Sequence, residues 1–152
     1  MHHFWRVIQH VPNIVPYPLF KSKVYVVVKK DDVLARKKRI DTADIKNRTL
    51  IVGGRAPKIL KNIQKKLIEH EHIEYINSPD HGTTLLYIST NQGICLAPGF
   101  LNDHNDEFAW IPFESDEYFE CLLCTQEYEK RKNVQNFIKL IQSYYANTQE
   151  KL

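Results

Sequence analysis

The residues best suited to binding chemistry are Gly53-Gly54-Arg55, which lie between an expected strand over 49–52 and an expected helix over 57–70. At such a junction the unpaired backbone N–H groups and the positive end of the helix dipole favour an anion. Glycine lets the main chain approach a ligand closely, and the guanidinium of Arg55 can offer two parallel donors to a carboxylate or phosphate. A tight turn without a ligand is the alternative, and these residues alone leave both interpretations open.

A second pair of small polar residues, Asn77 and Ser78, repeats this arrangement at the end of a strand expected over 73–77. If the two strands are parallel neighbours, both turns offer N–H donors to one crevice at the same sheet edge. Ser78 is also a natural N-cap for the helix that follows, with Pro79 in its first turn. Capping alone is therefore the other interpretation of Ser78.

The remaining reactive side chains form no complete catalytic or metal site. Cys121 and Cys124 have the CxxC spacing of metal ligands, but the sequence offers no second pair to complete a tetrahedral set. Ser78 and His81 lack a third group that would orient the histidine, and neither a GxSxG elbow nor a phosphate loop is present. We therefore expect no enzyme, no metal and no cofactor. A small α/β enzyme using Ser78, His81 or the cysteines is the competing hypothesis.

Strand and helix patterns alternate along most of the chain, which is typical of the α/β class. A connector with prolines at 12, 16 and 18 precedes the first long strand, and the charged segment 29–39 is expected to be an exposed loop with a short turn. A single helical turn is expected over 42–45. Strands are predicted over 19–28, 49–52, 73–77, 94–97, 108–113 and 118–124, and helices over 57–70, 78–91 and 132–145.

The composition indicates an ordinary globular protein, since 43% of the 152 residues are hydrophobic and 26% are charged. A net charge of +3 is too mild to indicate nucleic-acid binding. No run approaches the roughly 20 apolar residues of a membrane span, and the start Met1-His2-His3 lacks the apolar core of a signal peptide. Together with three cysteines, an odd number, these features lead us to expect a cytoplasmic protein.

The order of these elements resembles the effector-binding domain of LysR-type transcriptional regulators. Residues 19–28, with the following Asp32-Val33-Leu34-Ala35, are similar to the hinge strand of that family and its sequel, although the family often has His-Pro in place of Asp32-Val33. The turn over 40–47 and the strand over 49–52 are similar to the next elements. Residues 85–98 resemble the helix, glycine turn and proline-ended strand of the domain, and are the most specific part of the match. The strand over 119–124 and the final helix, in which Val134, Phe137 and Ile138 are expected to face inward, complete the likeness.

The resemblance implies a type 2 periplasmic-binding-protein-like fold, in which two lobes are joined by crossing hinge strands. Residues 1–26 and 120–147 would form a partial lobe I, residues 27–119 lobe II, and residues 148–152 a tail. A small, anionic effector would bind in the interlobe cleft, and the helix over 57–70 would pack against a partner protomer in a homo-oligomer. The expected ligand-binding residues are Gly53, Gly54, Arg55, Asn77, Ser78, Pro98 and Gly99 from lobe II, with Gln9 and His10 from lobe I.

Compared with a full regulator, the chain lacks the winged helix-turn-helix, the linker helix and the first elements of lobe I. We therefore expect an incomplete first lobe, as a natural truncation or as a fragment, and DNA contact only through a helix-turn-helix domain absent from this chain. The alternative with the same fold is a solute-binding protein fragment without a regulatory role, which the missing signal peptide disfavours. An upstream coding region with a helix-turn-helix would separate the two.

Overall fold

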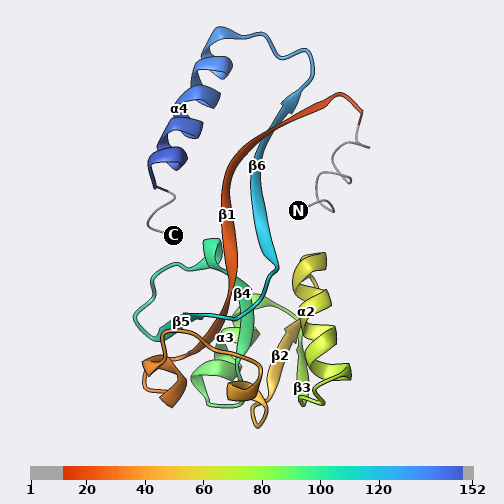
Figure 1. Ribbon diagram of the computed structural model, residues 1–152, viewed down its shortest axis with the longest axis vertical. Helices are drawn as coiled ribbons and strands as arrows, with labels where there is room; N and C mark the ends of the chain where they lie inside the picture. Colours follow the sequence, from red (N-terminus) through yellow and green to blue (C-terminus); the bar gives the residue numbers. More distant parts are fainter. Residues whose placement is uncertain (1–11, 149–152) are drawn as a thin grey trace. The chain divides into compact units, whose positions relative to one another are not determined.

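The computed structural model describes residues 12–148, and the chain divides into two compact units (Figure 1). One unit spans residues 23–119. The other combines residues 1–22 with residues 120–152. Gln9 and His10, which the resemblance places in the ligand site, lie outside the described residues.

The unit of residues 23–119 contains an antiparallel sheet in which β1 (Ile14–Lys29) lies between β4 (Cys95–Pro98) and β5 (Phe108–Pro112). Val26 is aligned with Leu96 on one side and with Ile111 on the other. The Val24–Val28 run is fully buried apart from Tyr25, as expected of a central strand rich in β-branched residues.

β1 begins at Ile14, so the expectation of an extended connector before residue 19 is wrong. Pro16 and Pro18 lie inside the strand. In this part β1 has no register with β4 or β5, and β6 (Tyr118–Gln126) is its partner among the described strands. Proline is tolerated there because one edge of this part of β1 has no partner among the described strands and so needs no N–H donor.

A second, two-stranded sheet carries the junctions of interest. β2 (Leu50–Gly53) and β3 (Tyr75–Ser78) are parallel neighbours, which is the condition for both turns to share one sheet edge, and Gly53 is aligned with Ser78. The crossover between them is α2 (Lys58–Glu69), and α3 (His81–Ser89) follows β3. Because the strands end in register, the two strand-to-helix junctions lie at one edge of the sheet.

α2 buries an apolar stripe of Leu60, Ile63 and Leu67 at helical spacing, which confirms the helix predicted over 57–70. The single turn predicted over 42–45 is also present, as η2 (Ala43–Ile45). The charged segment 29–39 contains the predicted short turn, as η1 (Val33–Arg36), although Leu34 within it is buried.

Asp32 stabilises the turn in this segment. Its carboxylate caps η1 by accepting from the Leu34 N–H at 2.9 Å and also pairs with the guanidinium of Arg48. The hydrogen bond from Arg48 lowers the pKa of Asp32 below its usual value. The charges of residues 29–39 alone do not predict the Asp32–Arg48 pair, because Arg48 lies outside the segment.

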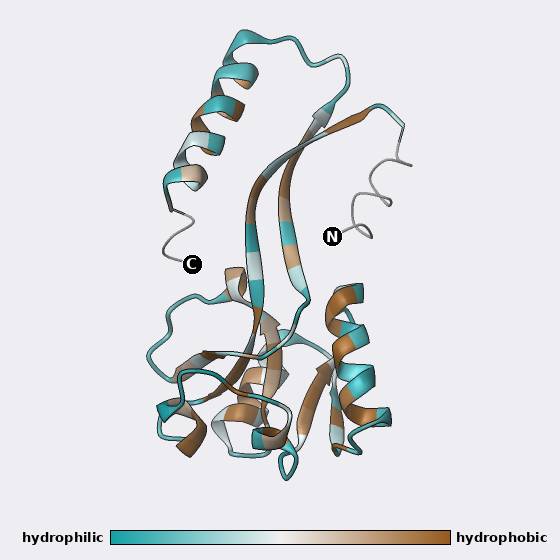
Figure 2. Cartoon of the chain, in the orientation of Figure 1, coloured by the Kyte–Doolittle hydropathy of each residue, from teal (hydrophilic) through white to brown (hydrophobic). Residues whose placement is uncertain are grey.

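Hydrophobic residues concentrate in the interior of the unit of residues 23–119 (Figure 2), which holds two buried clusters. In the other unit Ile138, on α4 (Lys132–Thr148), is the one fully buried hydrophobic residue among those described. Phe137 and Tyr144 of α4 are 51% and 61% exposed, so the expectation that Phe137 faces inward is wrong. Phe20 and Tyr145 stack with ring centroids 4.7 Å apart.

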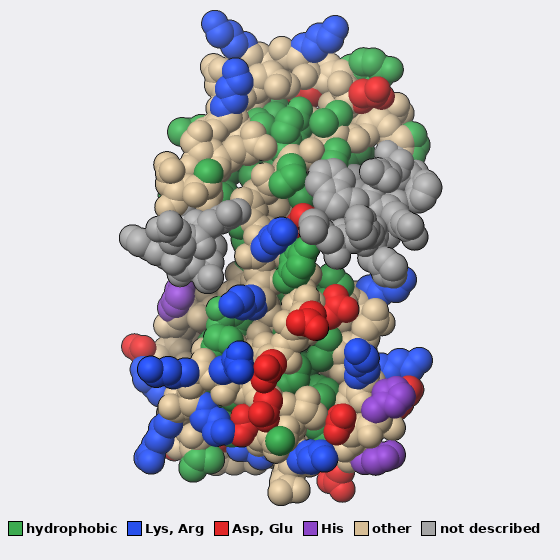
Figure 3. All heavy atoms as spheres, in the orientation of Figure 1, with side chains coloured by type: hydrophobic (Ala, Val, Ile, Leu, Met, Phe, Trp, Pro, Cys, Tyr) green, Lys and Arg blue, Asp and Glu red, His purple; other side chains and the backbone are tan. Residues whose placement is uncertain are grey.

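Acidic and basic side chains are intermingled on the face of the 23–119 unit shown in Figure 3, as its ion pairs also indicate. Opposite charges that alternate in this way give no single-sign field over that face. No described helix is long and apolar enough to cross a membrane.

Candidate functional site

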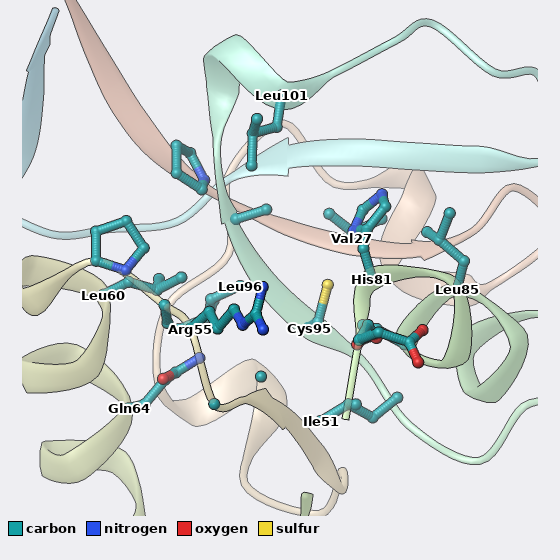
Figure 4. Close-up of a pocket in the computed structure, with 18 of the residues that line it drawn as sticks. Val27, Ile51, Arg55, Leu60, Gln64, His81, Leu85, Cys95, Leu96 and Leu101 are labelled. Atoms are coloured by element: carbon teal, nitrogen blue, oxygen red, sulfur yellow. The ribbon is translucent and has the colours of Figure 1, made fainter. Parts of the chain in front are cut away.

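A pocket of about 500 Å³ lies within the unit of residues 23–119, at the edge where β2 and β3 end (Figure 4). This size suits a small ligand. Arg55, Leu60 and Gln64 lie on one side of the view, His81 and Leu85 on the other, and Cys95 between them. The lining residues are Val27, Ile51, Gly53, Gly54, Arg55, Ala56, Pro57, Leu60, Gln64, Pro79, Asp80, His81, Thr84, Leu85, Cys95, Leu96, Ala97, Pro98, Leu101 and Trp110.

The junction between β2 and α2 is open. Gly53 and Gly54 both have ordinary negative φ, and a Cβ added to either would meet nothing within 4 Å. Neither the backbone conformation nor internal packing therefore requires glycine at these positions. Arg55 is exposed and forms no ion pair with any described residue. Pro57 precedes the helix without a side-chain cap, so the first-turn amides of α2 have no side-chain acceptor from it.

The junction between β3 and α3 is closed by its own side chains. Asp80 is the N-cap of α3, and its Oδ1 accepts from the Thr83 N–H at 2.7 Å. Ser78 is buried, and its hydroxyl donates to the Asp80 carbonyl at 2.9 Å. Thr84 Oγ1 lies 2.9 Å from Ser78 Oγ and 3.0 Å from the same carbonyl. These four residues thus satisfy one another without a ligand.

The prediction that Ser78 caps the helix is therefore wrong. Ser78 is still the last residue of β3, opposite Gly53, and the chain needs Pro79 and Asp80 to turn into α3. The hydrogen bonds from Thr83, the backbone N–H foremost, hold the pKa of Asp80 below its usual value. Asp80 is thus an ionised cap that already satisfies the start of α3.

Between the two junctions the pocket is largely apolar, with one thiol and one amide. Cys95 is buried on β4, and burial raises the pKa of its thiol to about 12. A neutral thiol is a poor nucleophile, so Cys95 contributes an apolar surface rather than reactivity. Gln64 of α2 is only 3% exposed, and its Oε1 has no hydrogen-bond partner among the described residues.

Four of the residues predicted from the sequence come together in this pocket, namely Gly53, Gly54, Arg55 and Pro98. Asn77, Ser78 and Gly99 lie close by in the chain but do not line it. Gln9 and His10 remain predictions, since they lie outside the described residues.

Gln64, Asp80 and His81 line the pocket but are not among the site residues predicted from the sequence. A signal for Gln64 was available, because it stands four residues after Leu60 and three before Leu67, on the stripe that α2 buries. A polar residue on an apolar stripe indicates either a buried hydrogen bond or a ligand contact. Asp80 offered the signal of an acidic residue in front of a helix.

The clusters needed for a metal centre are not seen in residues 12–148, where no three His, Cys, Asp or Glu side chains gather. Cys121 and Cys124 are free thiols on β6, one partly buried and one exposed. The Ser78 hydroxyl donates to a backbone carbonyl, so the Ser78–His81 pair does not show the hydrogen bond that a nucleophile and its base would share.

No protein-family model and no curated protein matches the sequence. Solved structures do match in fold. The effector-binding domain of QuiR in complex with shikimate has a TM-score of 0.61 at 18% identity, over 91% of this chain and 68% of that chain. The reduced OxyR regulatory domain from Pseudomonas aeruginosa has a TM-score of 0.62 at 15% identity, over 86% and 66%.

A third match is the regulatory domain of MetR, a LysR family regulator from N. meningitidis, with a TM-score of 0.58 at 17% identity over 91% of this chain and 66% of that chain. The chain thus spans about two-thirds of the length of these regulatory domains. The resemblance inferred from the sequence is confirmed at the level of the fold. This chain has the type 2 periplasmic-binding-protein-like fold of LysR-family regulatory domains, at about two-thirds of their length.

Proposed function

We propose that this chain is an effector-sensing domain of a LysR-type transcriptional regulator and that a small anion binds at the β2–α2 junction. The observation that carries the proposal is the open junction itself, in which helix amides without a side-chain cap and Arg55, which has no ion pair among the described residues, face a pocket in a regulatory-domain fold. A cation beside a helix N-terminus attracts a carboxylate or phosphate, and a bidentate contact with Arg55 would orient it.

The two glycines support this interpretation over a plain tight turn. A turn requires glycine where φ is positive or where a neighbour leaves no room for a Cβ, and neither condition holds at Gly53 or Gly54. Free space beside the backbone is what a ligand needs in order to reach main-chain N–H groups. Gly93 is the contrasting case, since its Cβ would lie 2.5 Å from the Thr49 carbonyl oxygen.

In this proposal the domain performs no chemistry. The ligand would favour one arrangement of the regulator over another by binding it more tightly, and so change DNA binding by a helix-turn-helix domain outside this chain. QuiR was solved in complex with shikimate, which is itself a small carboxylate. The interlobe cleft, the homo-oligomer and the DNA contact stay predictions of the resemblance.

The proposal is tested by titrating the 152-residue protein with benzoate, shikimate and inorganic phosphate in a calorimeter. Because a charged hydrogen bond contributes about 1.5–3 kcal/mol, Arg55→Ala should weaken the best of these by about tenfold or more. Arg36→Ala is the matched control, since Arg36 is also exposed but does not line the pocket. Loss of affinity in both variants, or in neither, would contradict the assignment, as would a failure of all three anions to bind.

A further inference from the structure

The buried amide of Gln64 is left without a role by the fold and by the anion site. Gln64 lies in the second turn of α2 among buried apolar neighbours, and nothing in the described chain hydrogen-bonds its Oε1. A buried polar group without a partner costs stability, and a hydrophobic side chain of similar shape would avoid that cost. The presence of glutamine at this position therefore points to a use outside the hydrophobic core.

The amide lies where a ligand would meet it. Gln64 lines the same pocket as Arg55, and Figure 4 shows the two side chains on the same side of it. The rest of that pocket is mostly apolar, with Leu60, Leu96 and Trp110 among its walls. A ligand whose anionic group binds Arg55 would thus place its body against apolar side chains and within reach of one polar side chain on α2.

We propose that Gln64 is a specificity-determining residue which hydrogen-bonds a hydroxyl group of the ligand, so that the effector is a small hydroxylated carboxylic acid. This inference rests on the proposed anion site. An amide presents a donor at one end and an acceptor at the other, and rotation by half a turn exchanges them. A hydroxyl can both donate and accept, so it satisfies whichever end of the amide faces the pocket, whereas a hydrocarbon satisfies neither.

Because a hydroxyl can pair with the Gln64 amide and a hydrocarbon cannot, the site should distinguish between ligands that differ only in this group. A ligand without a hydroxyl would bury the amide with no partner, and sites built to hydrogen-bond a substrate reject the analogue that lacks the group. A site that merely tolerates Gln64 for structural reasons would show no such preference. The distinction can be measured with ligands of equal size and charge.

The test compares 3- and 4-hydroxybenzoate with 3- and 4-methylbenzoate, which have a similar shape and the same carboxylate, with benzoate as reference. In the unmodified protein at least one hydroxybenzoate should bind about tenfold more tightly than its methyl counterpart. In Gln64→Met this preference should disappear while benzoate still binds, and the variant should melt at a higher temperature than the unmodified protein. Asn62→Met, which replaces an exposed amide on the same helix, should leave the preference intact.

Each result has a distinct meaning. If hydroxyl and methyl compounds bind equally to the unmodified protein, or if the preference survives in Gln64→Met, the role proposed for Gln64 is wrong although the anion site stands. If none of the five benzoates binds, the proposed anion site fails together with it. If Gln64→Met melts at a lower temperature and retains the preference, Gln64 has a purely structural role.

Discussion

The two strand-to-helix junctions at the edge of the parallel sheet are built alike, but a side chain caps the helix at only one of them. β2 and β3 end in register at Gly53 and Ser78, and each is followed two residues later by a charged side chain. At the β3 end that residue is Asp80, whose carboxylate accepts a hydrogen bond from the Thr83 N–H of α3. At the β2 end it is Arg55, which makes no ion pair with the described residues.

A helix N-terminus is available to a ligand only when the chain does not cap it. The Asp80 carboxylate accepts from the Thr83 N–H at the start of α3, and the Ser78 and Thr84 hydroxyls hold the Asp80 carbonyl. Pro57 offers no such oxygen to α2. The same sheet edge therefore carries one junction that contributes to stability and one that is free to bind.

The largest effect is expected from placing a negative charge in the open junction. Gly54→Glu should abolish binding of benzoate, because the carboxylate would occupy the space beside the backbone and neutralise Arg55. The fold should tolerate the change to within about 0.5 kcal/mol, since a Cβ at Gly54 meets nothing within 4 Å. Calorimetry and thermal melting measure the two quantities. Full benzoate affinity in Gly54→Glu would show that the anion binds elsewhere.

A smaller effect is expected from capping α2 in the way that α3 is capped. Pro57→Asp supplies a carboxylate to the first-turn amides, so it should weaken benzoate about tenfold, because a charge-assisted contact of this kind contributes about 1.5 kcal/mol. The thermal midpoint should stay the same or rise, since a cap is added while the rigidity of proline is lost. Unchanged affinity would mean that these amides do not contact the ligand.

The converse change, at the closed junction, is expected to affect stability rather than binding. Asp80→Ala should lower the thermal midpoint by a few degrees because α3 loses its cap, while benzoate affinity stays constant or rises as a nearby negative charge is removed. Asp80→Asn is the matched control, because asparagine caps without a charge. Weaker benzoate binding in both variants would indicate that the anion binds at the β3–α3 junction, which would contradict our account.

The smallest effect is a pH dependence at the same residue. Hydrogen bonds from Thr83 lower the pKa of Asp80, so its ionised cap stabilises the fold above the ordinary carboxyl pKa of about 4 and this contribution is lost as the pH falls through the lowered value. The unmodified protein should therefore lose thermal stability on acidification more steeply than Asp80→Asn. Parallel curves for the two proteins would contradict this role of the Asp80 charge.

The sequence was sufficient to predict both junctions but not the difference between them. Strand and helix periods place parallel strands ahead of α2 and α3, so the turn at Gly53-Gly54-Arg55 was expected at the sheet edge. Which junction is closed depends on where β3 ends. Ser78 remains paired opposite Gly53, and this moves the cap to Asp80, which a local pattern at Ser78 does not reveal.

Other features depend on contacts that are distant in sequence. The place of Gln64 on the apolar stripe of α2 follows from the sequence, but the burial of its Oε1 without a described partner depends on the elements packed around it. The helical period of α4 is correct, but its partners determine which apolar side chains are covered, so Ile138 is buried and Phe137 is half exposed. Periodicity predicts that a face exists and not what lies against it.

The central claim is that the β2–α2 junction binds an anion and the β3–α3 junction does not. Backbone amide NMR of the 152-residue protein during a benzoate titration tests it most directly, because each junction reports through its own N–H groups. Our account predicts saturable shifts at residues 54, 55 and 58–60, with residues 81–84 nearly unmoved. Shifts concentrated at residues 81–84, or the same pattern in Arg55→Ala, would contradict it.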